Sequence, residues 1–283
     1  VSQWKEATWL RLSRHKCPSS RWTAIRWLFL INRNNPNSIS AQTTVEDMEG
    51  DGKKVVTEGV DCKIPVTEAW LRKHRLLYNG ATKHPFIRSI RDGSVDFTSF
   101  KRWLGQDYIF VRSLVPFVAS TLVKSWKECG DGLDMEVILG GMASLNDEIN
   151  WFKKEASKFH VSLTNVIPQK ANIKYCRFLE SLTSSETEYA VAISVFWAIE
   201  VVYQESFAHC LEEGGTIPQE LQETCERWGN EAFGAYCKSL QDIANRCLHK
   251  ASAEVISKAE VSFLRVLEHE VEFWNMSVGE AGV

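Results

Sequence analysis

Residues 189–203 read YAVAISVFWAIEVVY, a largely apolar stretch that is long enough for about four turns of α-helix. Its first eleven residues carry no charge, and Glu200 is the only charged residue within it. At about 100° per residue, Glu200 lies on the same helical face as Phe196, Trp197, Tyr203, Gln204 and Phe207. The sequence therefore predicts a buried helix that carries one acid on its most aromatic face.

The position of Glu200 has two interpretations. Burying an unpaired carboxylate as the anion is costly, so either its pKa rises or a partner group compensates its charge. Functional sites produce this pattern, but structural ion pairs produce it as well. This helix alone leaves both interpretations open, and the other acids of the chain have to be considered.

The composition is that of an ordinary globular protein, with 44% hydrophobic and 24% charged residues. A net charge of −3 gives no electrostatic reason to expect a nucleic-acid partner. No uninterrupted apolar run approaches the roughly 20 residues that span a membrane, so no membrane partner is expected. The eight cysteines are scattered without a C-x-x-C pair, which predicts reduced thiols and a cytoplasmic protein.

Residues 1–64 differ in composition from the rest of the chain. Up to residue 44 there are seven Lys or Arg against a single acid, Glu6. A Ser- and Arg-rich, acid-poor segment is typical of an organellar transit peptide, which would make the localisation organellar. A translated leader upstream of Met48 is the alternative. We expect a weakly ordered extension over residues 1–64 and one domain over residues 65–283.

Helical signals begin at Val66 and continue to the end of the chain. We predict a first helix capped by Thr67, and the full set spans 66–79, 98–122, 134–160, 171–182, 188–213, 218–248 and 253–276. The sequence His84-Pro85-Phe86 is interpreted as an interruption. The pairs Gly140-Gly141 and Gly229-Asn230 indicate close contacts of the backbone with a neighbouring helix. No strand-like alternation or repeat is found, so we predict an all-α, single-domain helical bundle.

Two further acids lie on apolar helical faces. Asp107 shares its face with Phe100, Trp103, Leu104, Phe110, Val111 and Leu114. Glu270 shares its face with Phe263, Val266, Leu267, Phe273 and Trp274, whereas Glu268 and Glu272 point the other way. A buried salt bridge is the better interpretation of any single one. For three inward acids on three helices, a shared polar pocket inside the bundle is favoured.

The motifs that hold metals, nucleotides or nucleophiles are missing from the sequence. None of the seven His follows a Glu by three residues, and there is no H-E-x-x-H, P-loop, G-x-S-x-G or dinucleotide loop. No metal or cofactor is therefore expected, and a haem- or metal-binding bundle is a disfavoured alternative. Acid–base chemistry in an aromatic cage remains, because stacked rings and a carboxylate suit a flat, amino-substituted heterocycle. Crowded acids in a dry pocket acquire different pKa values, which supplies one proton donor and one acceptor.

Six segments together closely resemble the TenA family of thiamin-pyrimidine hydrolases, most of all its plant TENA_E branch. They are HPFIRSIRDGSVDFTSFKRWLGQDYIFVRSLVPF (84–117), GGMASLNDEINWF (140–152), ANIKYCRFL (171–179), FWAIEVVYQESFAHCL (196–211), RWGNEAFGAYC (227–237) and VLEHEVEFWNMS (266–277). The resemblance covers about residues 66–278. It implies a heme-oxygenase-like helical bundle, and it implies self-association, since family members commonly form homo-oligomers.

The resemblance also implies roles for individual residues. Asp107 matches the acid that binds the ring nitrogen and the amino group of the pyrimidine, and Phe110 matches an aromatic wall. Glu270 matches the general acid that protonates the leaving group. Three more residues match pocket aromatics: Tyr175, Tyr203 and Trp228.

One position departs from the family pattern. TenA proteins with a nucleophilic cysteine carry it two residues before the Trp of a C-Y-W segment, and this chain has Val195 there. The nearest cysteine on the same helix is Cys210. Covalent chemistry of the thiaminase type is therefore not expected. The TENA_E branch has a glutamate further along this helix, and Glu200 matches it.

The sequence and the resemblance together predict a cofactor-independent hydrolase of thiamin salvage. The expected substrates are 4-amino-5-aminomethyl-2-methylpyrimidine, which would be converted to its hydroxymethyl form, and the N-formyl derivative, which would be deformylated. Glu200 is expected to activate or position the water, while Glu270 protonates the departing nitrogen. The alternative is a non-catalytic pyrimidine-binding or seed-maturation-associated protein on the same bundle.

Overall fold

The computed structural model describes residues 64–128 and 132–279, and every regular element in these ranges is helical. In chain order the elements are α2 (Val66–Lys73), α3 (Arg75–Thr82), α4 (Pro85–Arg91), α5 (Phe97–Glu128), α6 (Leu133–Lys158), α7 (Lys170–Ser181), α8 (Tyr189–Leu211), the 3-10 helix η2 (Gln219–Leu221), α9 (Gln222–Gly229), α10 (Glu231–Lys250) and α11 (Ala253–Val278). The all-α prediction is confirmed. The predicted extension lies outside these ranges apart from Ile64, so the domain boundary stays a prediction.

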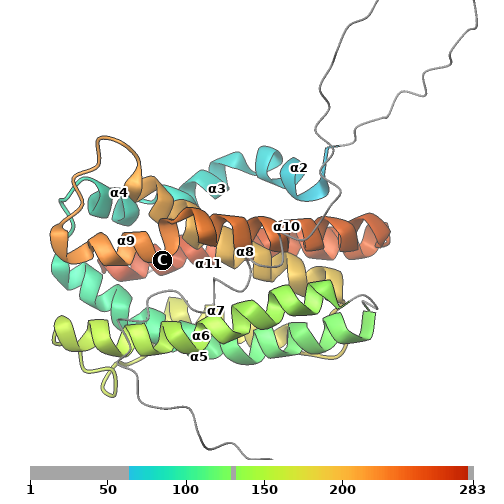
Figure 1. Ribbon diagram of the computed structural model, residues 1–283, viewed down its shortest axis with the longest axis horizontal. Helices are drawn as coiled ribbons and strands as arrows, with labels where there is room; N and C mark the ends of the chain where they lie inside the picture. The colour runs from blue at the N-terminus through green and yellow to red at the C-terminus, as the bar shows by residue number, and fades with distance from the viewer. Residues whose placement is uncertain (1–63, 129–131, 280–283) are drawn as a thin grey trace, which may run out of the picture. The chain divides into compact units, whose positions relative to one another are not determined.

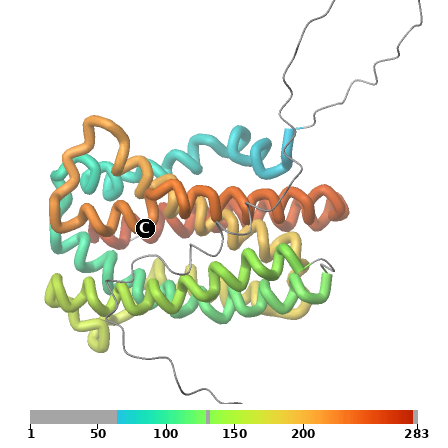
Figure 2. The backbone as a smooth tube through the Cα atoms, in the orientation of Figure 1, coloured from blue at the N-terminus to red at the C-terminus, as the bar shows by residue number. Residues whose placement is uncertain are grey.

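Helix α8 is the centre of the bundle. It packs against α3, α4, α5, α9, α10 and α11, and every residue from Tyr189 to Ile199 is buried. Figure 1 shows α5 and α6 running side by side along one side of the bundle, with α10 and α11 on the other side of α8. The tube in Figure 2 follows the same path, and α7 packs on both α5 and α11. The uncharged first half of α8 suits this place because none of its faces meets water.

Two helices in the described part of the chain are long and apolar enough to cross a membrane by length and composition alone. They are α5 and α8, and 83% of the most apolar window of α8 is buried inside the bundle, against 44% for α5. The packing of α8 against six other elements accounts for its apolar character, since a helix that is hydrophobic all round also suits the core of a folded protein.

The first predicted helix is in fact two. His74 ends α2 and precedes α3, and its Nε2 lies 2.6 Å from a carboxylate oxygen of Glu260 on α11. The predicted cap was also wrong, because Pro65 precedes the first helical residue and Thr67 lies inside α2. The backbone N–H of Thr67 instead donates to Asn245 on α10 at 3.1 Å. Long-range contacts therefore decided both features.

Two other breaks differ from the prediction. The predicted helix 218–248 divides into η2, α9 and α10, because Asn230 adopts an extended conformation and its side chain accepts from Phe233 N–H at 2.9 Å. The predicted interruption at residues 84–86 is instead the start of α4. There His84 Nδ1 accepts from Phe86 N–H at 3.1 Å, and Pro85 occupies the first turn, where its missing N–H costs nothing.

The close backbone contacts predicted at glycine are confirmed. A Cβ on Gly229 would lie 2.6 Å from the backbone carbonyl of Phe207, so only glycine lets α9 approach α8 this closely. A Cβ on Gly141 would lie 2.0 Å from the hydroxyl oxygen of Tyr236. Gly141 thereby leaves room for a polar group of α10 against α6.

Candidate active site

Asp107 lies on α5 and is completely buried. The hydroxyl of Tyr203 on α8 donates to Asp107 Oδ1 at 2.8 Å, whereas the buried Oδ2 accepts no hydrogen bond from the protein. Burial raises the pKa of Asp107 well above its usual range, and the hydrogen bond from Tyr203 only partly opposes this. A neutral Asp107 would carry one O–H donor beside one acceptor oxygen.

Glu270 on α11 is the second completely buried acid. The hydroxyl of Tyr175 on α7 donates to Glu270 Oε1 at 2.7 Å, and Oε2 is buried without a partner. Burial raises the pKa of Glu270 to about 8, against the hydrogen bond from Tyr175. The carboxyl group is therefore mostly protonated near neutral pH, which suits a proton donor.

Glu200 differs from its neighbours on α8. It is the only residue between Tyr189 and Tyr203 that is half-buried, while all the others are buried. Desolvation raises the pKa of Glu200 well above its usual range, and the negative charges of Glu148 and Glu270 raise it further. A carboxylate with a raised pKa is a stronger base than an exposed one once it has lost its proton.

The structure brings the three acids predicted from the sequence together. The charge of Glu270 interacts with Asp107 and with Glu200, although the acids come from α5, α8 and α11. Helix α8 packs on both of the other helices, so the three inward faces meet in the bundle. In the described part of the chain, none of the three forms an ion pair with Lys or Arg.

A fourth acid, Glu148 on α6, was missed by the sequence reasoning. Its Oε1 accepts from the indole Nε1–H of Trp228 at 2.7 Å, and its charge interacts with Asp107 and Glu200. A signal for it existed, because Leu145, Trp151 and Phe152 lie three or four residues away on one helical face. The polar neighbours of Glu148 in the segment NDEIN concealed that face.

The aromatic residues predicted for the pocket surround these acids. The ring centroids of Phe110 and Tyr175 lie 4.6 Å apart, beside Glu270. Those of Tyr203 and Trp228 lie 6.1 Å apart in an edge-to-face arrangement, beside Asp107. Tyr236, which the sequence reasoning also missed, has a buried hydroxyl without a hydrogen-bond partner, and its pKa is raised by burial and by Glu200.

The cluster has the chemistry of an acid–base site. Two tyrosine–carboxyl pairs, Tyr203–Asp107 and Tyr175–Glu270, lie among aromatic rings, and burial raises the pKa of both carboxyl groups. Glu200 supplies a third carboxyl group with some access. Among residues 64–128 and 132–279, no group of three His, Cys, Asp or Glu is placed to hold a metal ion. The residues can bind a polar ring, donate a proton and accept one.

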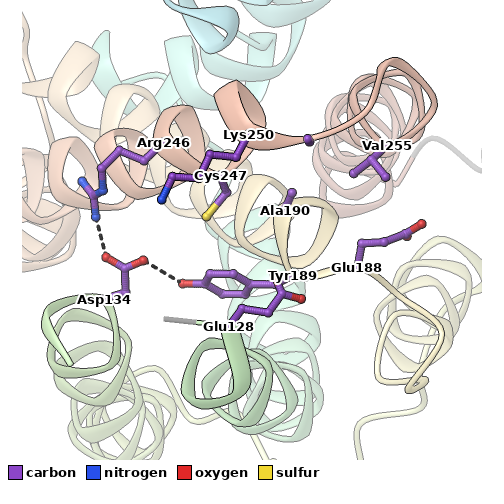
Figure 3. Close-up of a pocket in the computed structure, with 10 residues that line it drawn as sticks. Glu128, Asp134, Glu188, Tyr189, Ala190, Arg246, Cys247, Lys250 and Val255 are labelled. Carbon is purple, nitrogen blue, oxygen red and sulfur yellow. Dashed lines mark hydrogen bonds and ion pairs between the residues drawn. The ribbon is translucent and has the colours of Figure 1, made fainter. Parts of the chain in front are cut away.

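A surface pocket of about 470 Å³ lies at the N-terminal end of α8, away from the buried acids. Its lining includes Tyr189, which is eleven residues, or about 16 Å along the helix, from Glu200. Figure 3 shows Asp134 on α6 between Arg246 and the hydroxyl of Tyr189. Asp134 in this pocket is thus paired with a cation, unlike Asp107, Glu200 and Glu270.

The fold and the site together define a helical-bundle protein with a buried cluster of acids and aromatic rings. A protein-family model described as the TENA/THI-4/PQQC family matches residues 71–280, and the chain belongs to this family. It is 69% identical over 217 residues to a Glycine max protein named "Probable bifunctional TENA-E protein", across 77% of this chain and 95% of the relative. This similarity confirms the plant TENA_E branch.

Two more distant relatives are informative. A Helicobacter pylori protein named "Aminopyrimidine aminohydrolase" is 24% identical over 214 residues, across 71% of this chain and 93% of that protein. A solved TenA homologue from Pyrococcus furiosus is 22% identical and superposes with a TM-score of 0.68, over 75% of this chain and 99% of that one. The second likeness confirms the expected heme-oxygenase-like bundle.

Proposed function

We propose that this protein is a cysteine-independent aminopyrimidine hydrolase of thiamin salvage. Its substrates are 4-amino-5-aminomethyl-2-methylpyrimidine and the N-formyl derivative of that compound. The observation that carries the proposal is the meeting of two buried, tyrosine-bound acids with the more accessible Glu200 among aromatic rings. The printed names of the Glycine max and Helicobacter pylori relatives support the same substrate class.

Asp107 is the anchor of the pyrimidine in this proposal. The ring offers an acceptor nitrogen next to an exocyclic amino donor, and a neutral carboxyl group offers the complementary donor and acceptor. Burial favours the neutral form of Asp107, and its free Oδ2 has unused hydrogen-bonding capacity. Rings from Phe110 and Tyr203 then stack against or flank the flat substrate.

Glu200 and Glu270 perform the hydrolysis. Glu200 removes a proton from water, whose oxygen attacks the methylene carbon of the aminomethyl group. The carbon–nitrogen bond breaks, and Glu270 passes its proton to the departing nitrogen, which leaves as ammonia. In the N-formyl derivative, water attacks the formyl carbon instead, and the same proton transfers release formate and the free amine.

The proposed hydrolysis has no covalent intermediate, because α8 lacks the family's nucleophilic cysteine. Val195 occupies the position of the family's nucleophilic cysteine and is completely buried. Cys210 lies on the same helix, but its thiol contacts the backbone carbonyls of Ile87 and Ser206 at 3.5 Å. A water molecule activated by Glu200 is therefore the nucleophile in this proposal.

The test is a substrate panel with ammonia and formate readouts on the purified chain. We expect the aminomethyl pyrimidine to release ammonia and the formyl derivative to release formate. Glu200→Gln should abolish turnover, while Glu268→Gln, an exposed acid of α11, serves as the matched control. Full turnover in Glu200→Gln would overturn the role of Glu200. Binding of the pyrimidine without any turnover would instead identify a non-catalytic binding protein.

A further inference from the structure

Glu148 faces the site from α6, a helix that supplies none of the residues predicted from the sequence. Its Oε1 accepts from Trp228 Nε1–H at 2.7 Å, which links α6 to α9. The residue before it, Asp147, is exposed. Glu148 is therefore the inward member of two adjacent acids, and its carboxylate has a specific hydrogen-bond donor.

The Trp228 indole that Glu148 holds is part of the aromatic wall. Its ring centroid lies 5.0 Å from that of Trp151 and 5.1 Å from that of Phe207. It also meets Tyr203 edge to face at 6.1 Å. Tyr203 in turn donates to Asp107, so the hydrogen bond from the indole to Glu148 helps to fix the ring that flanks the proposed anchor.

Glu148 also faces charged groups from several helices. Arg227 on α9 stabilises its negative charge, and Asp147 and Glu223 share that arginine. On the other side are the two buried acids Asp107 and Glu200. Burial raises the pKa of Glu148, but the charge of Arg227 and the hydrogen bond from Trp228 oppose the rise. The charged form of Glu148 is thus favoured by a cation and by a hydrogen-bond donor.

Glu200 has no such compensation. It faces Glu148 from α6, Glu270 from α11, and Tyr236 and Cys237 from α10. Glu270 is mostly protonated near neutral pH, because burial raises its pKa to about 8. Of these groups, Glu148 is the one whose charged form a cation and a hydrogen-bond donor favour, and its charge raises the pKa of Glu200 more than that of Glu270 does.

We propose that Glu148 is a positioning residue of the active site, which holds the Trp228 indole in the pocket wall and keeps a negative charge opposite Glu200. This inference rests on the proposed hydrolase function. The charge makes Glu200 a stronger base, since a like charge favours the protonated form. The two tasks of Glu148 are separable, because a neutral side chain of the same shape can still accept from the indole.

The deciding variant is Glu148→Gln, which keeps an acceptor oxygen and removes the charge. We expect the acidic limb of kcat/KM to move toward lower pH by about one unit or more, as for removal of a nearby like charge. For each pH unit by which the limb moves, the ionised fraction of Glu200 at a given pH on that limb should rise about tenfold over wild type. The plateau of kcat should fall, since Glu200 becomes a weaker base, while KM stays unchanged.

Two further variants separate charge from position. Asp147→Asn removes a neighbouring but exposed charge and should leave the pH profile in place. Trp228→Phe removes the indole N–H, so it should raise KM, and because that hydrogen bond favours the charged form of Glu148, the acidic limb should move in the same direction as in Glu148→Gln but by less. If Glu148→Gln leaves the limb where it is, or if Asp147→Asn moves it equally, the proposed charge effect is wrong.

A readout that needs no turnover keeps this test independent of the proposed function. The infrared carbonyl band of a protonated carboxyl group that is lost in Glu200→Gln reports the titration of Glu200 directly. Its midpoint should move to lower pH in Glu148→Gln. If the wild type is inactive but the midpoint shifts, the hydrolase proposal is wrong and the effect of the Glu148 charge on the pKa of Glu200 is supported. An active wild type without the shift would overturn the role of Glu148 alone.

Discussion

Helix α8 passes two groups of buried carboxylates, one at its N-terminal end and one at its middle, and the two are buried in opposite ways. At the end near Tyr189, Asp134 is buried with Arg246 as an ion-pair partner (Figure 3). Eleven residues along the helix, Glu200 meets the negative charges of Glu148 and Glu270. The first arrangement neutralises an acid with a cation, whereas in the second desolvation and neighbouring acids raise the pKa of Glu200.

The difference separates an acid that serves stability from acids that serve chemistry. A structural acid gains from a partner of opposite charge, and its loss should weaken the fold. Acids that are buried without a cation cost stability, and their retention points to a task beyond folding. The predictions below test this distinction, from the largest expected effect to the smallest.

Replacing the buried acids should remove activity but not the fold. We expect Glu200→Gln and Glu270→Gln each to lower kcat about 10²- to 10⁴-fold, the usual contribution of a general acid or base. Thermal unfolding should occur at the same or a higher temperature, because each change removes a carboxyl group that burial disfavours. Steady-state kinetics and calorimetry measure the two effects, and a large loss of stability with normal kcat would contradict the distinction.

Gly141→Ala should destabilise the packing of α6 against α8 and α10. The new Cβ would lie 2.0 Å from the hydroxyl oxygen of Tyr236 and 3.3 Å from a ring carbon of Phe196. Overpacking of this kind costs about 1–3 kcal/mol of unfolding free energy. Urea unfolding measures the loss, and adding Tyr236→Phe should recover part of it because the clashing oxygen is removed. No recovery in the double variant would place the strain elsewhere.

Asp134→Asn should weaken the fold slightly and spare the chemistry. Arg246 is about half exposed, so water compensates for much of the lost ion pair, and we expect a cost of about 1 kcal/mol. The kcat/KM of the folded protein should equal that of wild type. Chemical unfolding and steady-state kinetics on the same preparation check both statements. A loss of activity that exceeds the loss of folded protein would mean that the ion pair of Asp134 and the acid cluster around Glu200 are coupled.

Stability should decline as the pH rises through the pKa of Glu270. Its folded-state pKa of about 8 is higher than that of an exposed glutamate, so the folded protein binds more protons than the unfolded chain between about pH 4.5 and 8. Stabilisation by the proton is complete below this window and is lost across it, with a slope of up to about 1.4 kcal/mol per pH unit. In Glu270→Gln, unfolding experiments across this window should show a shallower slope, and an unchanged slope would contradict the raised pKa.

Much of the site was predictable from helical periodicity. Asp107, Glu200 and Glu270 each share a face with large apolar side chains, and a helix with such a face has to turn it toward the core. The close helix contacts at Gly141 and Gly229 were equally predictable, since glycine inside a helix often marks a place where a neighbouring helix approaches the backbone closely. Family motifs then assigned roles to the aromatic residues, and those roles stay predictions.

Only the tertiary structure decided which groups meet and where helices end. Periodicity places a side chain on a face, but it does not name the partner across the interface, so Tyr203 with Asp107 and Glu148 with Trp228 emerged from packing. His74 divides the first predicted helix where it meets Glu260, a residue 186 positions away. The sequence by itself determined which faces are buried, because burial follows from local composition. The tertiary structure determined the charge around each acid, because that charge comes from distant helices.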